Sequence, residues 1–173
     1  ACYQLGYGCC QKRIQATMTC QTMAMAVDLA SHKETTRRLL KGAGLPVPPG
    51  RVVTTIKEAL SAARELGYPV VVKPCRGNQG KGVLLDIKND REIKEAYKLA
   101  QRFDKQVLVE KHVEGRHYRL LVIGGRVVAA AERFPAAVIG DGKHTIRELI
   151  EMANQDSRRG RGHDLPLTKM GID

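Results

Sequence analysis

Apolar and polar positions alternate with two different periods between residues 51 and 112. Short apolar runs predict strands at 51–54, 68–73, 83–87 and 106–112. Two stretches between these runs have apolar residues at helical spacing. The residues on these helical faces are Ala59, Leu60, Ala63 and Leu66 in the first stretch, and Ile93, Ala96, Tyr97 and Ala100 in the second. The predicted order is β-α-β-β-α-β, which is typical of an α+β fold with the helices on one face of a sheet.

Four residue pairs have the spacing of a capping box, in which each side chain accepts a hydrogen bond from the other residue's backbone N–H. The pairs are Ser31 with Glu34, Thr55 with Glu58, Asn89 with Glu92, and Thr145 with Glu148. Each pair precedes a helical pattern, so we expect four capped helices. Residues 45–50, LPVPPG, predict an extended connector, because three prolines cannot donate to a sheet.

Beyond Gly115 the pattern changes to two longer strands, at 118–123 and 126–133. Gly124 and Gly125 join them and suit a two-residue turn with positive φ, so the sequence predicts an antiparallel hairpin. Residues 1–30 are mixed in pattern, and Gly6 and Gly8 count against a long helix there.

The composition excludes some classes of protein. The 173 residues are 43% hydrophobic, enough to bury a core. No apolar run approaches the roughly 20 residues that span a bilayer, and no secretion signal opens the chain. We therefore expect a cytoplasmic protein without a membrane partner. The first residue is not Met and lies in an apparently structured segment, which suggests a piece of a longer protein.

The net charge of +11 favours anionic partners. A nucleic acid or another polyanion is one candidate, supported by Arg158, Arg159 and Arg161. Aromatic residues make up only 4% of the chain and are not interleaved with the basic residues, so a nucleic-acid stacking surface is disfavoured. A solvated basic surface without a specific partner is the simpler explanation of the charge.

Five cysteines form an odd set without CxxC pairs, and four of them fall within the first 20 residues. Zinc sites need closely paired ligands, so reduced thiols are the simpler interpretation. Cys75 lies beside the glycine-rich stretch, where we expect it to be a small packing residue.

The stretch 70–83, VVVKPCRGNQGKGV, runs from an apolar strand into a basic, glycine-rich loop and then into another strand. This order excludes a Rossmann turn, and the spacing of a P-loop is also missing. A flexible hairpin of this kind can fold over a phosphate chain, with Lys81 and backbone N–H groups meeting the anionic oxygens. Lys73 would add a fixed charge at the strand end. A mobile hairpin without a ligand remains the alternative.

A second stretch, 107–122, has an apolar strand that ends in Glu110 and Lys111 before a break at Glu114 and Gly115. Backbone N–H and C=O groups at such a strand end can recognise the edge of a purine, while Val113 covers one face of the base.

These motifs together resemble the ATP-grasp superfamily, on residues 31–50, 67–83 and 107–122. Within it, residues 4–19, 26–36, 118–150 and 154–173 resemble the amino-terminal ligase part of the cyanophycin synthetases. The resemblance covers nearly the whole chain. It implies an N-terminal segment with a capped helix and connector at 1–50, a nucleotide-binding lobe at 51–114, and the start of an incomplete second lobe at 115–173.

The resemblance also implies roles for individual residues. Lys33 and Lys73 would bind the ATP phosphates, under a loop that contains Gly77, Gly80, Lys81 and Gly82. Glu110, Lys111 and Val113 would form the adenine hinge. His117 falls where the superfamily usually has an acidic ribose ligand, which leaves that contact in doubt. Arg133 would face the acyl-phosphate or its attacking amine, although an exposed charge at a strand end is an equally simple interpretation.

The implied activity is that of an ATP-dependent carboxylate-amine ligase that forms an acyl-phosphate and adds aspartate to the poly-aspartate backbone of a cyanophycin primer. The magnesium ligands are expected outside this chain, because Asp141 and Asp164 are isolated, and the piece alone is expected to be inactive. The resemblance allows a homo-oligomeric parent enzyme. Alternatives are another ATP-grasp peptide ligase, of the glutathione or D-alanine ligase type, and a non-catalytic basic binding module.

Overall fold

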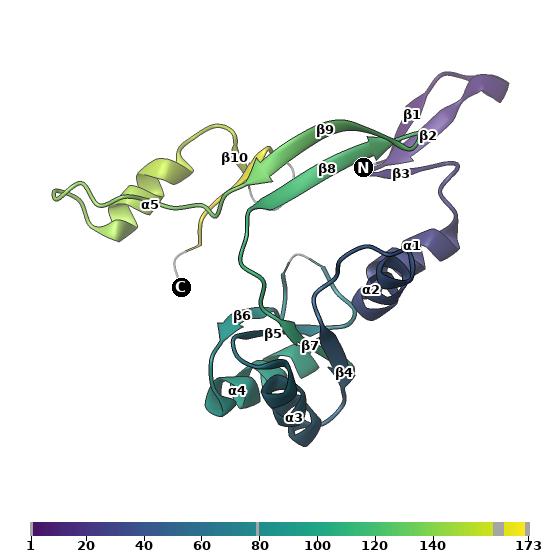
Figure 1. Ribbon diagram of the computed structural model, residues 1–173. Helices are drawn as coiled ribbons and strands as arrows, with labels where there is room; N and C mark the ends of the chain where they lie inside the picture. The colour runs from purple at the N-terminus through teal and green to yellow at the C-terminus, as the bar shows by residue number, and fades with distance from the viewer. Residues whose placement is uncertain (1, 79, 161–164, 172–173) are drawn as a thin grey trace. The chain divides into compact units, whose positions relative to one another are not determined.

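The computed structural model describes residues 2–78, 80–160 and 165–171 (Figure 1). The chain divides into two compact units, Ala1–Glu114 and Gly115–Asp173. Each unit has its own secondary structure.

A four-stranded antiparallel sheet forms the centre of the first unit. The strands lie in the order β4-β7-β5-β6. Their bounds are Gly50–Val53 for β4, Val70–Pro74 for β5, Leu84–Ile87 for β6 and Val107–Lys111 for β7. Helices α3, Ile56–Leu66, and α4, Asp90–Gln101, pack together on one face of this sheet (Figure 1). The predicted β-α-β-β-α-β order is therefore confirmed.

The hydrophobic core lies between this sheet and its two helices. The predicted face of α4 is fully buried, since Ile93, Ala96, Tyr97 and Ala100 are at most 1% exposed. The face of α3 is rotated slightly from the prediction: Ala59, Ala62 and Ala63 are buried, whereas Leu60 and Leu66 pack at the edge of the core. Every buried residue in the described chain lies between Val53 and Glu110.

The helix caps follow the predicted spacing in three of four cases. Thr55, Asn89 and Thr145 each accept a hydrogen bond from the backbone N–H three residues later. Only Thr145 forms the complete reciprocal box within the described residues, with Glu148.

The predicted cap at Ser31 is wrong. Ser31 is the last residue of α1, Ala24–Ser31, and its hydroxyl donates to Asp28 O at 2.8 Å. Helix α2, Lys33–Gly42, begins one residue later, with His32 as its N-cap. The His32 Nδ1 accepts from the Thr35 N–H at 3.2 Å, so the cap is shifted by one residue from the expected bond between Ser31 and the Glu34 N–H.

Before α1, residues 3–19 form a small antiparallel sheet in the order β1-β2-β3. Its strands are Tyr3–Leu5, Lys12–Gln15 and Met18–Thr19, and a 3₁₀ turn, η1, at Gly8–Cys10 lies between the first two. No described residue of this small sheet is buried.

The second unit contains the predicted hairpin, formed by β8, His117–Ile123, and β9, Arg126–Arg133. Gly124 and Gly125 make its turn with φ of +57° and +75°. Helix α5, Ile146–Asn154, and two short parallel strands, β10 at Arg159–Gly160 and β11 at Leu167–Thr168, complete the described part. Across the described chain, no helix is long and apolar enough to cross a membrane.

Candidate functional site

Lys33 and Lys73 line the same cavity, which has a volume of about 330 Å³. Lys33 is the first residue of α2, and Lys73 lies near the end of β5. We call this space the lysine cavity. Its described lining consists of Ala30, Lys33, Thr36, Arg37, Leu40, Val47, Pro48, Lys73, Leu108 and Glu110. The fold thus brings together two ammonium groups that lie 40 positions apart in the sequence.

The Lys73 ammonium forms an ion pair with the Glu110 carboxylate. Val71 lies opposite Glu110 in the β5–β7 pairing, and Lys73 is two residues beyond Val71, so the two charged side chains share one face of the sheet. Glu110 is only 8% exposed. Because this carboxylate is buried, the ion pair holds a positive charge at a defined position in the cavity.

Lys33 is tied to the beginning of the glycine-rich loop. Its backbone N–H donates to Cys75 O at 2.9 Å, and its Nζ donates to Gly77 O at 3.0 Å. Burial, followed by the Lys73 ammonium, lowers the pKa of Lys33 below its ordinary value of 10.5. Both ammonium groups belong to side chains that line one cavity, so they repel each other, and an anion placed between them would relieve the repulsion.

Arg37 is a third cation of the lysine cavity, and the sequence analysis missed it. Its Nε and Nη2 donate to the two carboxylate oxygens of Glu34 at 2.8 and 2.9 Å. This hydrogen bonding raises the pKa of Arg37. Within the described residues, Nη1 has no hydrogen bond, so one edge of the guanidinium remains available. The four-residue spacing from Lys33 on one helix is the signal that could have revealed Arg37.

The other predicted loop residues do not line the lysine cavity. Lys81 is exposed, and Gly77, Gly80 and Gly82 have φ of +124°, +74° and +68°. Gly82 is held against the ring of Phe103, where an added Cβ would lie 2.5 Å from Cδ2. The loop is thus anchored at both ends, by Lys33 at one and by Phe103 at the other.

At the end of β7, the hydrogen-bond donors of Lys111 already have partners, whereas the backbone N–H of Val113 is available within the described residues. The Lys111 Nζ donates to the carbonyls of Gly67 and Tyr68 at 2.8 and 3.0 Å, and its N–H donates to Pro49 O. The Lys111 ammonium therefore holds the loop before β5 in place. Val113 is 59% exposed, and its N–H has no partner within the described residues.

His117 and Arg133 lie in the second unit, opposite each other at the open end of the β8–β9 hairpin. Both side chains are exposed. The hairpin register thus pairs the predicted ribose-position residue with the predicted catalytic arginine.

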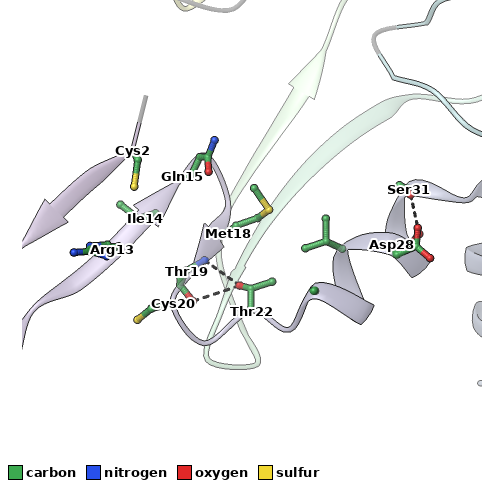
Figure 2. Close-up of a pocket in the computed structure, with 12 residues that line it drawn as sticks. Cys2, Arg13, Ile14, Gln15, Met18, Thr19, Cys20, Thr22, Asp28 and Ser31 are labelled. Atoms are coloured by element: carbon green, nitrogen blue, oxygen red, sulfur yellow. Dashed lines mark hydrogen bonds between the residues drawn. The ribbon is translucent and has the colours of Figure 1, made fainter.

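A second cavity, of about 600 Å³, lies between the N-terminal sheet and α1 (Figure 2). Arg13 of β2 and Asp28 of α1 are charged residues of opposite sign in its lining. Asp28 Oδ1 also accepts from Arg76 Nη1 at 3.0 Å, which connects α1 to the glycine-rich loop.

The residues considered for polyanion or metal binding mostly form ion pairs or hydrogen bonds within the second unit. The Arg158 guanidinium pairs with Asp156, and Arg159 Nη1 donates to Thr168 O at 2.9 Å. Asp141 accepts from the backbone N–H groups of Lys143 and His144. Arg161 and Asp164 lie outside the described residues. Among those described, no group of three or more His, Cys, Asp or Glu side chains is placed to hold a metal ion.

All five cysteines are free thiols, as the sequence predicts. Cys75 is fully buried, and burial raises the pKa of its thiol to about 11. Cys2, Cys9, Cys10 and Cys20 are exposed and unbridged. Cys75 is thus a packing residue of the core.

Comparison with known proteins connects this geometry to a family. Residues 32–161 match the model of the carbamoyl-phosphate synthase L chain ATP-binding domain. A cyanophycin synthetase from Crocosphaera subtropica is 50% identical over 176 aligned positions, which cover 100% of this chain and 20% of the relative. The chain therefore spans about a fifth of the length of the curated relatives it matches.

Two solved structures have similar folds. A bifunctional glutathione synthetase from Pasteurella multocida is 30% identical, with a TM-score of 0.51 over 98% of this chain and 23% of that one. A D-alanyl-alanine synthetase A from Vibrio cholerae has a TM-score of 0.52 at 22% identity, over 63% of this chain and 35% of that one, and supports the fold alone.

Proposed function

The chain belongs to the family of the carbamoyl-phosphate synthase L chain ATP-binding domain, which has the ATP-grasp fold, and from that premise we propose that it is the ATP-binding part of a cyanophycin synthetase. The parent enzyme would use ATP to activate a carboxylate and would then join an amino acid to it through an amide bond. The similarity to cyanophycin synthetases along the entire chain supports this assignment over other ligases.

The convergence of Lys33 and Lys73 in the lysine cavity carries the proposal. A triphosphate is a linear polyanion, and two ammonium groups in one cavity can contact its phosphates through charge-assisted hydrogen bonds. Arg37 adds a planar donor in the same space. No neutral ligand would gain as much from this arrangement.

Phosphate binding would change the partners of both lysines. Lys73 is paired with Glu110, and Lys33 donates to Gly77 O. Phosphate oxygens would compete with these acceptors, so that Lys33 releases the start of the glycine-rich loop as the ligand enters. The N–H groups of that loop, including those at Gly80 and Gly82, would then be free to cover the phosphates.

The adenine would lie at the end of β7. Val113 offers an unpaired N–H within the described residues, and its exposed side chain can cover one face of a purine. Lys111 would act indirectly, because its ammonium is occupied by two backbone carbonyls and holds the neighbouring loop in position.

In the reaction, the γ-phosphoryl group would pass to the terminal carboxylate of a poly-aspartate primer. The amine of aspartate would attack the resulting acyl-phosphate and displace phosphate. Lys33 and Lys73 would stabilise the negative charge on the phosphates during transfer. His117 and Arg133 would contribute from the hairpin, to the ribose and to the acyl-phosphate respectively.

Magnesium would supply further charge neutralisation between the phosphates, but the described residues do not provide a donor set for it. Asp141 is already satisfied by backbone N–H groups and by His144. We propose that the magnesium ligands belong to other parts of the longer enzyme.

Calorimetry of ATP binding to the Lys73→Ala variant tests the proposal. Loss of a charge-assisted phosphate contact costs about 1.5–3 kcal/mol, so affinity should fall roughly 10- to 100-fold. The substitution also leaves Glu110 unpaired, so the same measurement is made on a Lys73→Ala/Glu110→Gln variant. Lys57→Ala, an exposed change on α3, is the matched control. Unchanged affinity in both cavity variants would refute the phosphate assignment.

A glutathione ligase is the second candidate, supported by the Pasteurella multocida structure at 30% identity. The two candidates differ in the amino acid that triggers ATP hydrolysis in the full-length enzyme. Aspartate with a cyanophycin primer should stimulate ADP release if the proposal is correct, whereas stimulation by glycine with γ-glutamylcysteine would identify a glutathione ligase.

A further inference from the structure

We propose that Cys9 and Cys10 form a vicinal dithiol site that chelates a soft, thiophilic ion, such as a trivalent arsenical. The site lies in the turn between β1 and β2. It is independent of the proposed ATP-binding function.

The two thiols face each other and are accessible. Their Sγ atoms are 4.0 Å apart, and both residues are exposed and unbridged. Within the described part of the chain, neither sulfur has any other hydrogen-bond partner. Nothing in this turn therefore competes with a ligand for the thiols.

The turn holds the two cysteines in a defined conformation. The Cys10 N–H donates to Tyr7 O and the Gln11 N–H donates to Gly8 O, both at 3.2 Å. Gly6 has φ of +74°, and a Cβ at this position would lie 3.1 Å from Cys10 O. A side chain at position 6 would therefore crowd the Cys10 carbonyl and strain the turn that carries both cysteines.

The sulfur separation fits a shared ion. Two bonds of about 2.3 Å, the length of a zinc–thiolate bond, reach across at most about 4.6 Å, so one ion can bridge the pair without movement of the backbone. A disulfide fits less well, because consecutive Cα atoms are about 3.8 Å apart and unstrained disulfides need about 4.4–6.8 Å.

A site with only two thiol donors favours a ligand that needs two protein sulfurs over a metal ion that needs four protein ligands. The described residues contain no group of three or more His, Cys, Asp or Glu side chains suited to a metal, so a tetrahedral all-protein zinc site is excluded there. An organic trivalent arsenical needs only two further ligands. Thiolate sulfur is also the soft type of donor that thiophilic ions prefer.

The reaction with phenylarsine oxide is balanced without an oxidant. Two S–H bonds break and two As–S bonds form, while the oxide oxygen leaves as water with the two thiol protons. Arsenic remains trivalent throughout.

Intact-mass spectrometry of the reduced 173-residue chain with phenylarsine oxide, in excess glutathione, tests the site. A chelate resists a monothiol, so one adduct per chain should persist and should disappear on addition of a small dithiol. Cys9→Ser and Cys10→Ser should each abolish the glutathione-resistant adduct. The Cys2→Ser/Cys20→Ser double variant, which keeps the turn intact, should retain it.

Persistence of the adduct in either single variant, or its loss in the double variant, would overturn the proposal. Circular dichroism confirms that the variants remain folded. Gly6→Ala keeps both thiols but strains the turn, so its adduct should be released at a lower glutathione concentration. Equal resistance in Gly6→Ala would overturn the role assigned to the turn.

Discussion

Two effects lower the pKa of Lys33. Partial burial and the neighbouring Lys73 ammonium both disfavour its charged form, so its pKa is lowered. A bound polyphosphate would reverse the electrostatic part of this shift, because opposite charge favours the ammonium. Lys33 should therefore take up a proton when ATP binds at alkaline pH.

This linkage predicts the pH dependence of ATP binding. If Lys33 contacts phosphate as proposed, its protonated form would bind more tightly, so affinity should be highest below the lowered pKa and should fall as pH rises through it towards 10.5. Calorimetry in buffers of different ionisation enthalpy measures the proton uptake directly. Lys33→Arg, which stays protonated, should flatten the alkaline decline, and an unchanged pH profile in that variant would contradict the assignment.

Substitution of Arg37 should also weaken ATP binding. Arg37→Ala should weaken ATP binding about tenfold, because one charge-assisted contact is lost. Arg38→Ala is the matched control, since Arg38 is exposed and does not line the lysine cavity. Equal effects of the two substitutions would show that only the net charge of α2 matters.

Single residues were predictable from sequence to different degrees. Lys73 could be placed because an apolar strand ends at it. Arg37 was missed because its helix was predicted from the capping spacing at its start, which does not say what its charged side chains face. His32 was missed as a cap because histidine is not among the preferred N-cap residues. The ion pair of Lys73 with Glu110 depends on strand register, which local pattern does not specify.

At the scale of elements, the glycine-rich loop has one position that is much more restricted than its neighbours. Gly80 and Gly82 both have positive φ, but an added Cβ meets nothing within 4 Å at Gly80, whereas at Gly82 it meets Phe103. Gly80→Ala should cost only the backbone strain of about 1–2 kcal/mol. Gly82→Ala should cost more, because the ring or the backbone must also move.

Urea denaturation of the two variants measures this difference in the free energy of unfolding. A loss of stability at Gly82 no larger than that at Gly80 would mean that Phe103 rotates away freely. The comparison separates packing from backbone strain, since both substitutions add the same methyl group.

The helices and strands themselves were largely predictable. Asn89 with Glu92 marked the start of α4, and the spacing of Ile93, Ala96, Tyr97 and Ala100 marked its buried face. The strands of the N-terminal sheet were not predicted, because they are only two to four residues long and have no buried side to impose alternation.

Across the whole molecule, burial is distributed very unevenly. The buried residues of the described chain lie between Val53 and Glu110, while the β8–β9 hairpin exposes apolar side chains such as Leu120, Ile123 and Val127. Amides in β5 and β7 should therefore exchange hydrogen only on global unfolding, whereas those in β8 and β9 should exchange through local opening.

Hydrogen exchange followed by mass spectrometry on the 173-residue chain tests this contrast. Peptides from β8 and β9 should exchange at least tenfold faster than peptides from β5 and β7. Equally slow exchange would show that the hairpin is covered, for example by self-association, and dilution would then restore fast exchange.

The confinement of buried residues to one stretch also has an evolutionary consequence. Substitutions in the hairpin or in the small opening sheet cost little folding free energy, because they disturb no close-packed side chain. Sequence changes can therefore accumulate in these parts while the close-packed core between Val53 and Glu110 stays intact.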